Sequence, residues 1–129
     1  MNLLLIDSTK PQLVVALAQD GKLVQTKTCD EQRQHDKNIN ALIKQLGVTK
    51  YDAVAVVVGP GSWTGIRVGL AVAKAFSYVQ QIPLIELRDQ IDVGVAMQKF
   101  RDGAVVSPFA AKPFYNGEFV VKNRLPKNA

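Results

Sequence analysis

Hydrophobic and polar residues alternate in two different ways along the chain. Near the N-terminus the apolar residues form short runs typical of strands, and Asp20 with Gly21 supplies a two-residue hairpin signal between two of these runs. After residue 36 they return every three or four positions, which is typical of a helix with one buried face. The pattern predicts strands over residues 2–7, 12–18, 22–28, 53–58, 83–87 and 103–107, and helices over 36–46, 66–79 and 88–100.

This order of elements predicts an α/β fold with a mixed β-sheet and flanking helices. A hairpin comes first, and strands and helices then alternate. Asp36 is expected to cap the first helix, and Gly47 is expected to follow its last turn. Asn116 and Gly117 predict a second hairpin turn. Because no repeat or linker interrupts the sequence, residues 1–129 are expected to form a single domain.

The composition is that of a globular and mildly basic chain. It has 129 residues, 16 Lys and Arg, 11 Asp and Glu, and a net charge of +5. The charges form no block, which indicates a soluble surface rather than a dedicated nucleic-acid binder and leaves a weak phosphate-facing patch near the C-terminus as the alternative. No membrane span or signal peptide is visible. One cysteine, Cys29, and one histidine, His35, can form neither a disulfide nor a zinc site, so we expect a cytoplasmic protein.

A glycine-rich loop between a buried strand and the next helix is the most informative segment. It reads Gly59-Pro60-Gly61-Ser62-Trp63-Thr64-Gly65, and free N–H groups at the start of such a helix bind phosphate. The spacing matches neither a Walker A loop nor the dinucleotide fingerprint, so a tight turn without a ligand is the alternative. The candidate phosphate or nucleotide residues are Asp7, Gly59, Gly61, Ser62, Thr64, Gly65 and Arg67.

Several single residues keep two interpretations open. Asp7 ends the first strand, where it serves either as a ligand residue or as a carboxylate that caps the turn. Arg67 lies in the first turns of a helix, against the helix dipole, so a nearby anion or acidic partner residue would explain it. Trp63 is expected to meet a partner or to cover a ligand, because a large exposed aromatic side chain is costly. His35 is interpreted as a loop or cap residue, and Cys29 as a small buried hydrophobe.

The helix after the glycine-rich loop is apolar on two faces. One face is a ridge of small residues spaced four apart, which comprises Gly65, Gly69, Ala73 and Ser77. An adjacent face is bulkier and suits the sheet, and it comprises Val68, Val72, Ala75, Phe76 and Val79. The ridge packs either against helix 36–46 or, together with that helix, against another subunit. In the second case the interface residues are Ile39, Leu42, Ile43, Leu46, Trp63, Ile66, Gly69, Leu70, Ala73 and Ser77.

The segment from Gly59 to Phe76, G-P-G-S-W-T-G-I-R-V-G-L-A-V-A-K-A-F, closely resembles the signature of the TsaB family. Further segments agree with the family in order, namely L-L-L-I-D-S-T near the N-terminus, Gln34-His35 ahead of the first helix, and Pro83-Leu84-Ile85. The resemblance implies an actin-like (ASKHA, RNase H-like) fold. It assigns the N-terminal half of that fold to residues 1–100 and a partial β extension to residues 101–129.

The resemblance also implies a function. TsaB-like proteins are non-catalytic subunits in the synthesis of N6-threonylcarbamoyladenosine in tRNA. They bind a catalytic actin-like paralogue of the TsaD type, which holds the metal, through the first two helices of each chain. A P-loop ATPase subunit of the TsaE type completes the assembly. In this chain the two helices are 36–46 and 64–80.

Further expectations follow from the resemblance. The chain should have no catalytic residue, no metal site and no tightly bound cofactor of its own, with ATP or ADP at the subunit interface as an option. It should contact tRNA only through the complex, stay away from membranes, and form a homodimer when isolated. The alternative is a nucleotide-binding enzyme or ATPase that uses the loop from Gly59 to Gly65 as a phosphate cradle.

Overall fold

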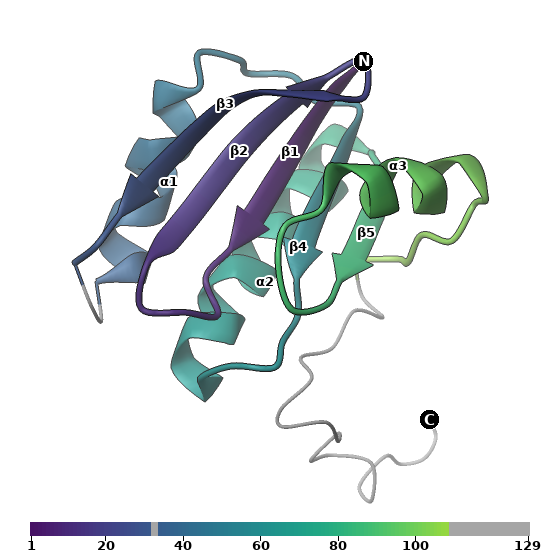
Figure 1. The fold of residues 1–129 in the computed structure, drawn as a ribbon. Coiled ribbons are helices and arrows are strands. Elements are labelled where there is room, and N and C mark those ends of the chain that lie inside the picture. Colours follow the sequence, from purple (N-terminus) through teal and green to yellow (C-terminus); the bar gives the residue numbers. More distant parts are fainter. Residues whose placement is uncertain (32–33, 109–129) are drawn as a thin grey trace, which may run out of the picture.

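One five-stranded sheet and three helices make up the part of the chain that the structure, a computed structural model, describes: residues 1–31 and 34–108 (Figure 1). The strands are β1 (Asn2–Asp7), β2 (Leu13–Gln19), β3 (Lys22–Cys29), β4 (Ala53–Val57) and β5 (Leu84–Leu87). The helices are α1 (His35–Gln45), α2 (Trp63–Gln80) and α3 (Val93–Arg101). The predicted α/β class with a mixed sheet and flanking helices is confirmed.

The strands lie in the order β3-β2-β1-β4-β5. β1 and β3 pair with β2 in antiparallel fashion, whereas β4 runs parallel to both β1 and β5. Between β2 and β3, Asp20 and Gly21 have φ angles of 52° and 82°. Both angles lie in the left-handed region that a two-residue hairpin turn requires, so the predicted hairpin is confirmed.

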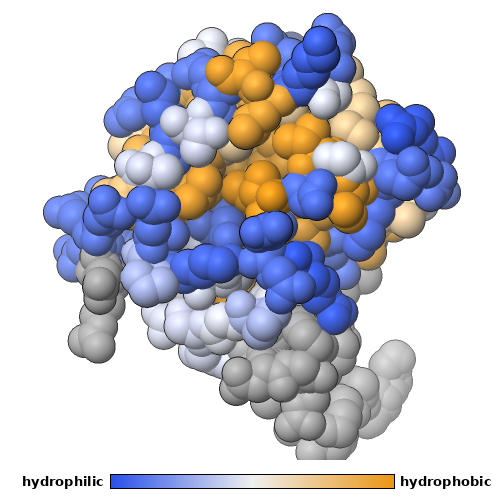
Figure 2. All heavy atoms as spheres, viewed as in Figure 1, coloured by the Kyte–Doolittle hydropathy of each residue, from blue (hydrophilic) through white to orange (hydrophobic). Residues whose placement is uncertain are grey.

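β1 is buried on both of its sides. Leu4 and Ile6 point to the face of the sheet that α1 and α2 cover, whereas Leu3 and Leu5 point to the opposite face, which carries α3 (Figure 1). All four side chains are at most 1% exposed. This agrees with the nearly continuous apolar run of the segment, which predicts a strand buried on both faces. Figure 2 shows hydrophobic residues gathered on the face that carries α3.

α1 begins earlier than the sequence pattern predicts. Its N-cap is Gln34, which makes no side-chain capping bond, and Asp36 lies inside the first turn. The prediction that Asp36 caps the helix is therefore wrong. The ring of His35 instead fixes the start of the helix, because its Nε2 lies 2.8 Å from the carbonyl oxygen of Lys10. At the other end, Gly47 follows the helix with a φ of 78°, as predicted.

The other two helices begin where a side chain caps them. α2 starts at Trp63, three residues earlier than predicted, because the Ser62 hydroxyl accepts a hydrogen bond from the Gly65 N–H at 3.1 Å. α3 starts later than predicted, after Asp92, whose carboxylate accepts a hydrogen bond from the Val95 N–H at 3.0 Å. In both cases the cap satisfies a backbone group that the helix itself leaves without a partner.

The predicted strand over residues 103–107 is wrong. The Ala104 N–H donates to the carbonyl oxygen of Lys99 at 2.8 Å, so this residue still closes the C-terminal end of α3 rather than pairing with the sheet. Only Val106 then reaches the sheet, where it forms an isolated bridge with Leu84. One bridge does not make a strand, because a strand needs several consecutive paired residues.

Two predictions for the C-terminal segment concern residues that the structure does not describe. The hairpin turn at Asn116 and Gly117 lies there, as do residues 109–129 of the expected β extension. Both stay predictions. Of the helices that the structure does describe, none combines the length and the apolar character needed to cross a membrane.

Candidate functional site

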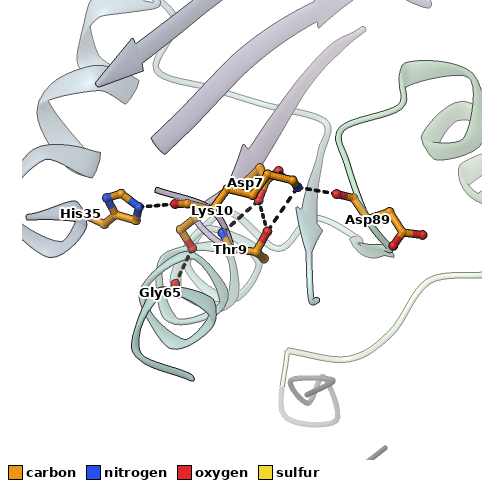
Figure 3. Close-up of polar contacts among 7 residues, drawn as sticks. Asp7, Thr9, Lys10, His35, Gly65 and Asp89 are labelled. Atoms are coloured by element: carbon orange, nitrogen blue, oxygen red, sulfur yellow. Dashed lines mark hydrogen bonds and ion pairs between the residues drawn. The ribbon is translucent and has the colours of Figure 1, made fainter. Parts of the chain in front are cut away.

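The turn after β1 is held together by Asp7 (Figure 3). Its carboxylate accepts hydrogen bonds from the Thr9 N–H at 2.9 Å and the Thr9 hydroxyl at 2.6 Å, and it forms an ion pair with the Lys10 amine at 2.8 Å. The same amine donates to the carbonyl oxygen of Asp89, which ties the turn to the loop after β5. Asp7 is only 4% exposed. Of its two interpretations, the structure supports the carboxylate that caps the turn.

Ser8 joins this turn to the start of α2. Its buried hydroxyl donates to the carbonyl oxygen of Gly65 at 2.5 Å and accepts from the Gly69 N–H at 2.9 Å. A Cβ atom at Gly65 would lie 2.3 Å from the Ser8 carbonyl oxygen, and one at Gly69 would lie 2.3 Å from the Ser8 hydroxyl oxygen. Only glycine therefore permits this approach of the turn to the helix.

The glycine-rich loop packs against the same turn. A Cβ atom at Gly61 would lie 2.5 Å from the carbonyl oxygen of Thr9, and the carbonyl oxygen of Gly59 accepts a hydrogen bond from the Asp89 N–H at 3.0 Å. Five of the seven candidate phosphate residues are therefore used in contacts within the chain, namely Asp7, Gly59, Gly61, Ser62 and Gly65. The structure gives the loop a packing role, with Thr64 and Arg67 exposed at its edge.

Nine of the ten residues predicted to touch another subunit are instead buried in the core of this chain. They are Ile39, Leu42, Ile43, Leu46, Ile66, Gly69, Leu70, Ala73 and Ser77. The small ridge of α2 faces β1 and its turn, so these side chains pack within this chain, and their role in a contact with another subunit stays a prediction. Of the bulkier residues expected on the sheet, Val68, Val72 and Phe76 are partly buried against the core, whereas Ala75 is exposed and Val79 is 75% exposed.

A groove runs between α1 and α2 on their outer side. It comprises two hollows of about 640 Å³ and about 420 Å³, which share Asp36, Thr64 and Val68 in their walls. The first hollow lies at the N-terminal ends of both helices, where Lys10 and Trp63 also line it. The second lies further along the helices. Its remaining lining residues are Ile39, Asn40, Arg67, Ala71 and Val72. We call this groove, together with the outer side of α2 that exposes Tyr78 and Val79, the helical face.

Large hydrophobic side chains are exposed along α2. Trp63 at its first turn is 50% exposed, and Tyr78 and Val79 at its last turn are 57% and 75% exposed. The guanidinium carbon of Arg67 lies 5.4 Å from the centroid of the Trp63 ring, so this cation packs over an aromatic face. Of the ten predicted contact residues, Trp63 is thus the one that the structure leaves on the surface.

The spacing of small residues in α2 indicates which side of this helix faces outward. A ridge of glycine and alanine spaced four apart permits the closest approach of another backbone, and the nearest backbone is that of the same chain. The opposite side of α2 must then face solvent, and it carries Ala71, Tyr78 and Val79. Bulk alone does not mark the buried side of a helix, so the prediction that Val79 lies on the sheet is wrong.

His35 is a buried connector between α1 and the turn after β1. A carbonyl oxygen can only accept, so His35 Nε2 carries the hydrogen that it donates to Lys10. Its Nδ1 is buried without a hydrogen-bond partner among the described residues. Cys29 is partly exposed rather than buried, with its sulfur 3.9 Å from a carboxylate oxygen of Glu31. Across residues 1–31 and 34–108, no three His, Cys, Asp or Glu side chains are grouped so that they could hold a metal ion.

Comparison with known proteins gives a consistent set of relatives. The family model described as "TsaD: tRNA N6-adenosine threonylcarbamoyltransferase" matches residues 29–106. The tRNA threonylcarbamoyladenosine biosynthesis protein TsaB of Haemophilus influenzae is 32% identical over 93 residues, which cover 67% of this chain and 39% of that protein. TsaB of Bacillus subtilis is 26% identical over 133 residues, which cover 97% of this chain and 58% of that protein.

Solved structures agree with these relatives. YeaZ from Pseudomonas aeruginosa superimposes with a TM-score of 0.61 and 25% identity, over 80% of this chain and 50% of that one. The present chain thus spans only about half the length of the relatives it matches. Together with the strand order, these matches confirm the actin-like, RNase H-like fold. The chain belongs to the family of the threonylcarbamoyltransferase model, and its curated relatives identify it as a TsaB-type member of that family.

Proposed function

We propose that the chain is a non-catalytic scaffold subunit of the complex that makes N6-threonylcarbamoyladenosine in tRNA. It binds a catalytic, TsaD-type actin-like paralogue through the helical face. A TsaE-type ATPase joins the assembly, and tRNA is reached only through the complex. Two observations from relatives support this role, since the curated relatives are named as biosynthesis proteins for this modification and the matching family model is named for its transferase.

The exposed hydrophobic side chains on α2 carry the proposal. Trp63, Tyr78 and Val79 together place three large apolar groups, each at least half exposed, on the outer side of one helix. Burial of such a side chain is worth about 1.5–3 kcal/mol, so a partner that covers them gains a substantial part of a binding energy. The groove between the helices supplies the concave surface into which side chains of the partner fit.

The glycine-rich loop supports a scaffold rather than the alternative, a nucleotide-binding enzyme or ATPase. A phosphate cradle needs backbone N–H groups that are open to a ligand. Here the Gly65 N–H is bonded to Ser62, and Gly61 and Gly65 are packed against the turn after β1. The carboxylate of Asp7 is likewise engaged within its own turn. We therefore expect no tightly bound cofactor, with ATP or ADP confined to the seam between the subunits.

Co-purification with the TsaD-type paralogue tests the proposal. Val79→Arg on α2 is the disruptive variant, and Val95→Arg on α3 is its matched control, because Val95 is also exposed (44%) but lies on the opposite face of the sheet. We expect Val79→Arg to weaken the complex by at least about 30-fold, since it places an unpaired charge among the large hydrophobic side chains that α2 exposes. The control should bind as the unaltered chain does.

Other results would contradict the proposal. If the unaltered chain does not bind the paralogue, or if Val79→Arg binds as well as Val95→Arg, the helical face is not the contact. Sedimentation of the isolated chain adds a second readout, because the same face should hold the homodimer and Val79→Arg should then release a monomer. Calorimetry with ATP and ADP completes the test, since micromolar binding by the isolated chain would favour the enzyme.

A further inference from the structure

The two helices of the helical face carry a marked excess of positive charge. α1 contains Lys37 and Lys44, and α2 contains Arg67 and Lys74. Asp36 is the one acidic residue in either helix, so four cations stand against one carboxylate and the pair has a net charge of +3. None of the four cations forms an ion pair within residues 1–31 and 34–108. Their charges are available to another molecule.

The four cations form two stripes, one on each helix, and Arg67 of the α2 stripe also lines the second hollow. Each pair is seven residues apart, which is two helical turns, so both members of a pair lie on the same side of their helix. Lys37 and Lys44 are exposed on the outer side of α1, opposite its buried residues. Arg67 is exposed on α2 and Lys74 is half-buried there. In the second hollow an apolar strip of Val68, Ala71 and Val72 lies beside the polar residues Asp36, Asn40 and Thr64.

We infer that the partner surface that docks on the helical face is acidic, with carboxylates placed on both sides of an apolar ridge that enters the groove. The inference rests on the proposed function and adds the chemistry of the partner to it. Protein interfaces combine an apolar centre with a polar rim, and complementary charge at the rim steers the encounter. Asp36, at the N-terminal end of the groove, is the position where the partner is expected to present a cation or a hydrogen-bond donor.

A protein fits this arrangement better than a nucleic acid does. The phosphate backbone of tRNA would neutralise the four cations, but it offers no apolar group to enter the groove between them. The exposed Val79 would also stay in water. An acidic helical surface satisfies both the charged stripes and the apolar groove, so the observations favour it.

Charge reversal with kinetic binding measurements tests the inference. The double variant Arg67→Glu and Lys74→Glu is compared with Arg101→Glu on α3, which changes the charge of the opposite face of the sheet. The ligand is the TsaD-type paralogue, and salt is raised from about 0.1 M to about 1 M, which shortens the Debye length from about 10 Å to about 3 Å. At the lower salt we expect the double variant to bind at least about tenfold more weakly, mainly through slower association.

The outcomes separate the inference from the proposed function. An acidic partner is supported if the double variant binds more weakly than the unaltered chain at low salt and this difference in affinity vanishes at high salt. The Arg101→Glu control should bind as the unaltered chain does. Binding that charge reversal leaves unchanged or strengthens overturns the inference while the scaffold role stands. Absence of binding by the unaltered chain overturns both. If the isolated chain binds tRNA and the double variant does not, the basic stripes serve nucleic acid and the inference is wrong.

Discussion

Replacement of Gly69 by alanine is a direct test of how α2 docks on the turn after β1. The new Cβ atom would lie 2.3 Å from the hydroxyl oxygen of Ser8 and 3.1 Å from Cγ2 of Ile6. The first distance is far below van der Waals contact, so the Ser8 hydroxyl must move. It would then give up its hydrogen bonds to the Gly65 carbonyl oxygen at 2.5 Å and from the Gly69 N–H at 2.9 Å.

Two opposing effects decide how much Gly69→Ala changes the free energy of unfolding. Alanine is a better helix former than glycine, which favours Gly69→Ala by about 0.5–1 kcal/mol. Against it stand two lost hydrogen bonds at about 1 kcal/mol each and an overpacked core, which costs about 1–3 kcal/mol. The free energy of unfolding should therefore fall by about 2–4 kcal/mol. For a domain of this size the midpoint of thermal unfolding should fall by about 4 °C for each kcal/mol.

Urea unfolding followed by far-UV circular dichroism measures this loss, and Ser8→Ala supplies the internal control. In the double variant Ser8→Ala with Gly69→Ala the clashing oxygen is absent. The sum of the losses in unfolding free energy of the two single variants should therefore exceed the loss of the double variant by about 1 kcal/mol or more. A Gly69→Ala protein as stable as the original, or strictly additive losses, would refute the close approach described here.

The remaining predictions concern stability. Tyr51→Phe should raise the free energy of unfolding by about 1 kcal/mol, because the Tyr51 hydroxyl is buried without a partner in the described part of the chain while its ring packs edge-on against Phe76 at 5.9 Å. Burial raises the pKa of Tyr51 above its ordinary value of 10.0, so the protein loses stability as the pH rises past 10.0, where the tyrosine of the unfolded chain ionises. In urea titrations at a series of pH values, Tyr51→Phe should lose less stability over this alkaline range than the original protein. An equal loss in both proteins would contradict this role of Tyr51. Gly94→Ala in α3, whose Cβ would meet nothing closer than 3.4 Å, should leave stability equal or raise it by up to about 1 kcal/mol, and a measured loss would show that the available space has been misjudged.

Local sequence signals were sufficient for most of the fold. The left-handed turn at Asp20 and Gly21, the buried β1 and the left-handed Gly47 each depend on a few neighbouring residues, and each was predicted. The antiparallel hairpin and the order of strands and helices follow from the same kind of local information.

The orientation of α2 could not be predicted in that way. It depends on Ser8, which is 57 and 61 residues away from the two glycines that it contacts. Nothing in the helix itself indicates that its small ridge faces this turn, so the sequence alone leaves open whether the ridge packs within the chain or against another subunit. The first residue of α1 was predicted wrongly for a related reason. His35 is fixed by the carbonyl oxygen of Lys10, 25 residues earlier, rather than by a local cap.

The position of β1 in the sheet has a consequence for synthesis on the ribosome. Its antiparallel neighbour β2 emerges almost immediately, but the residues that pair with its other edge, Ala53 to Val56, emerge about fifty residues later. Until then the nascent chain presents one open edge of an apolar strand. Completion of the sheet must therefore wait for translation of β4, and a nascent chain halted before that point is a natural client for chaperones.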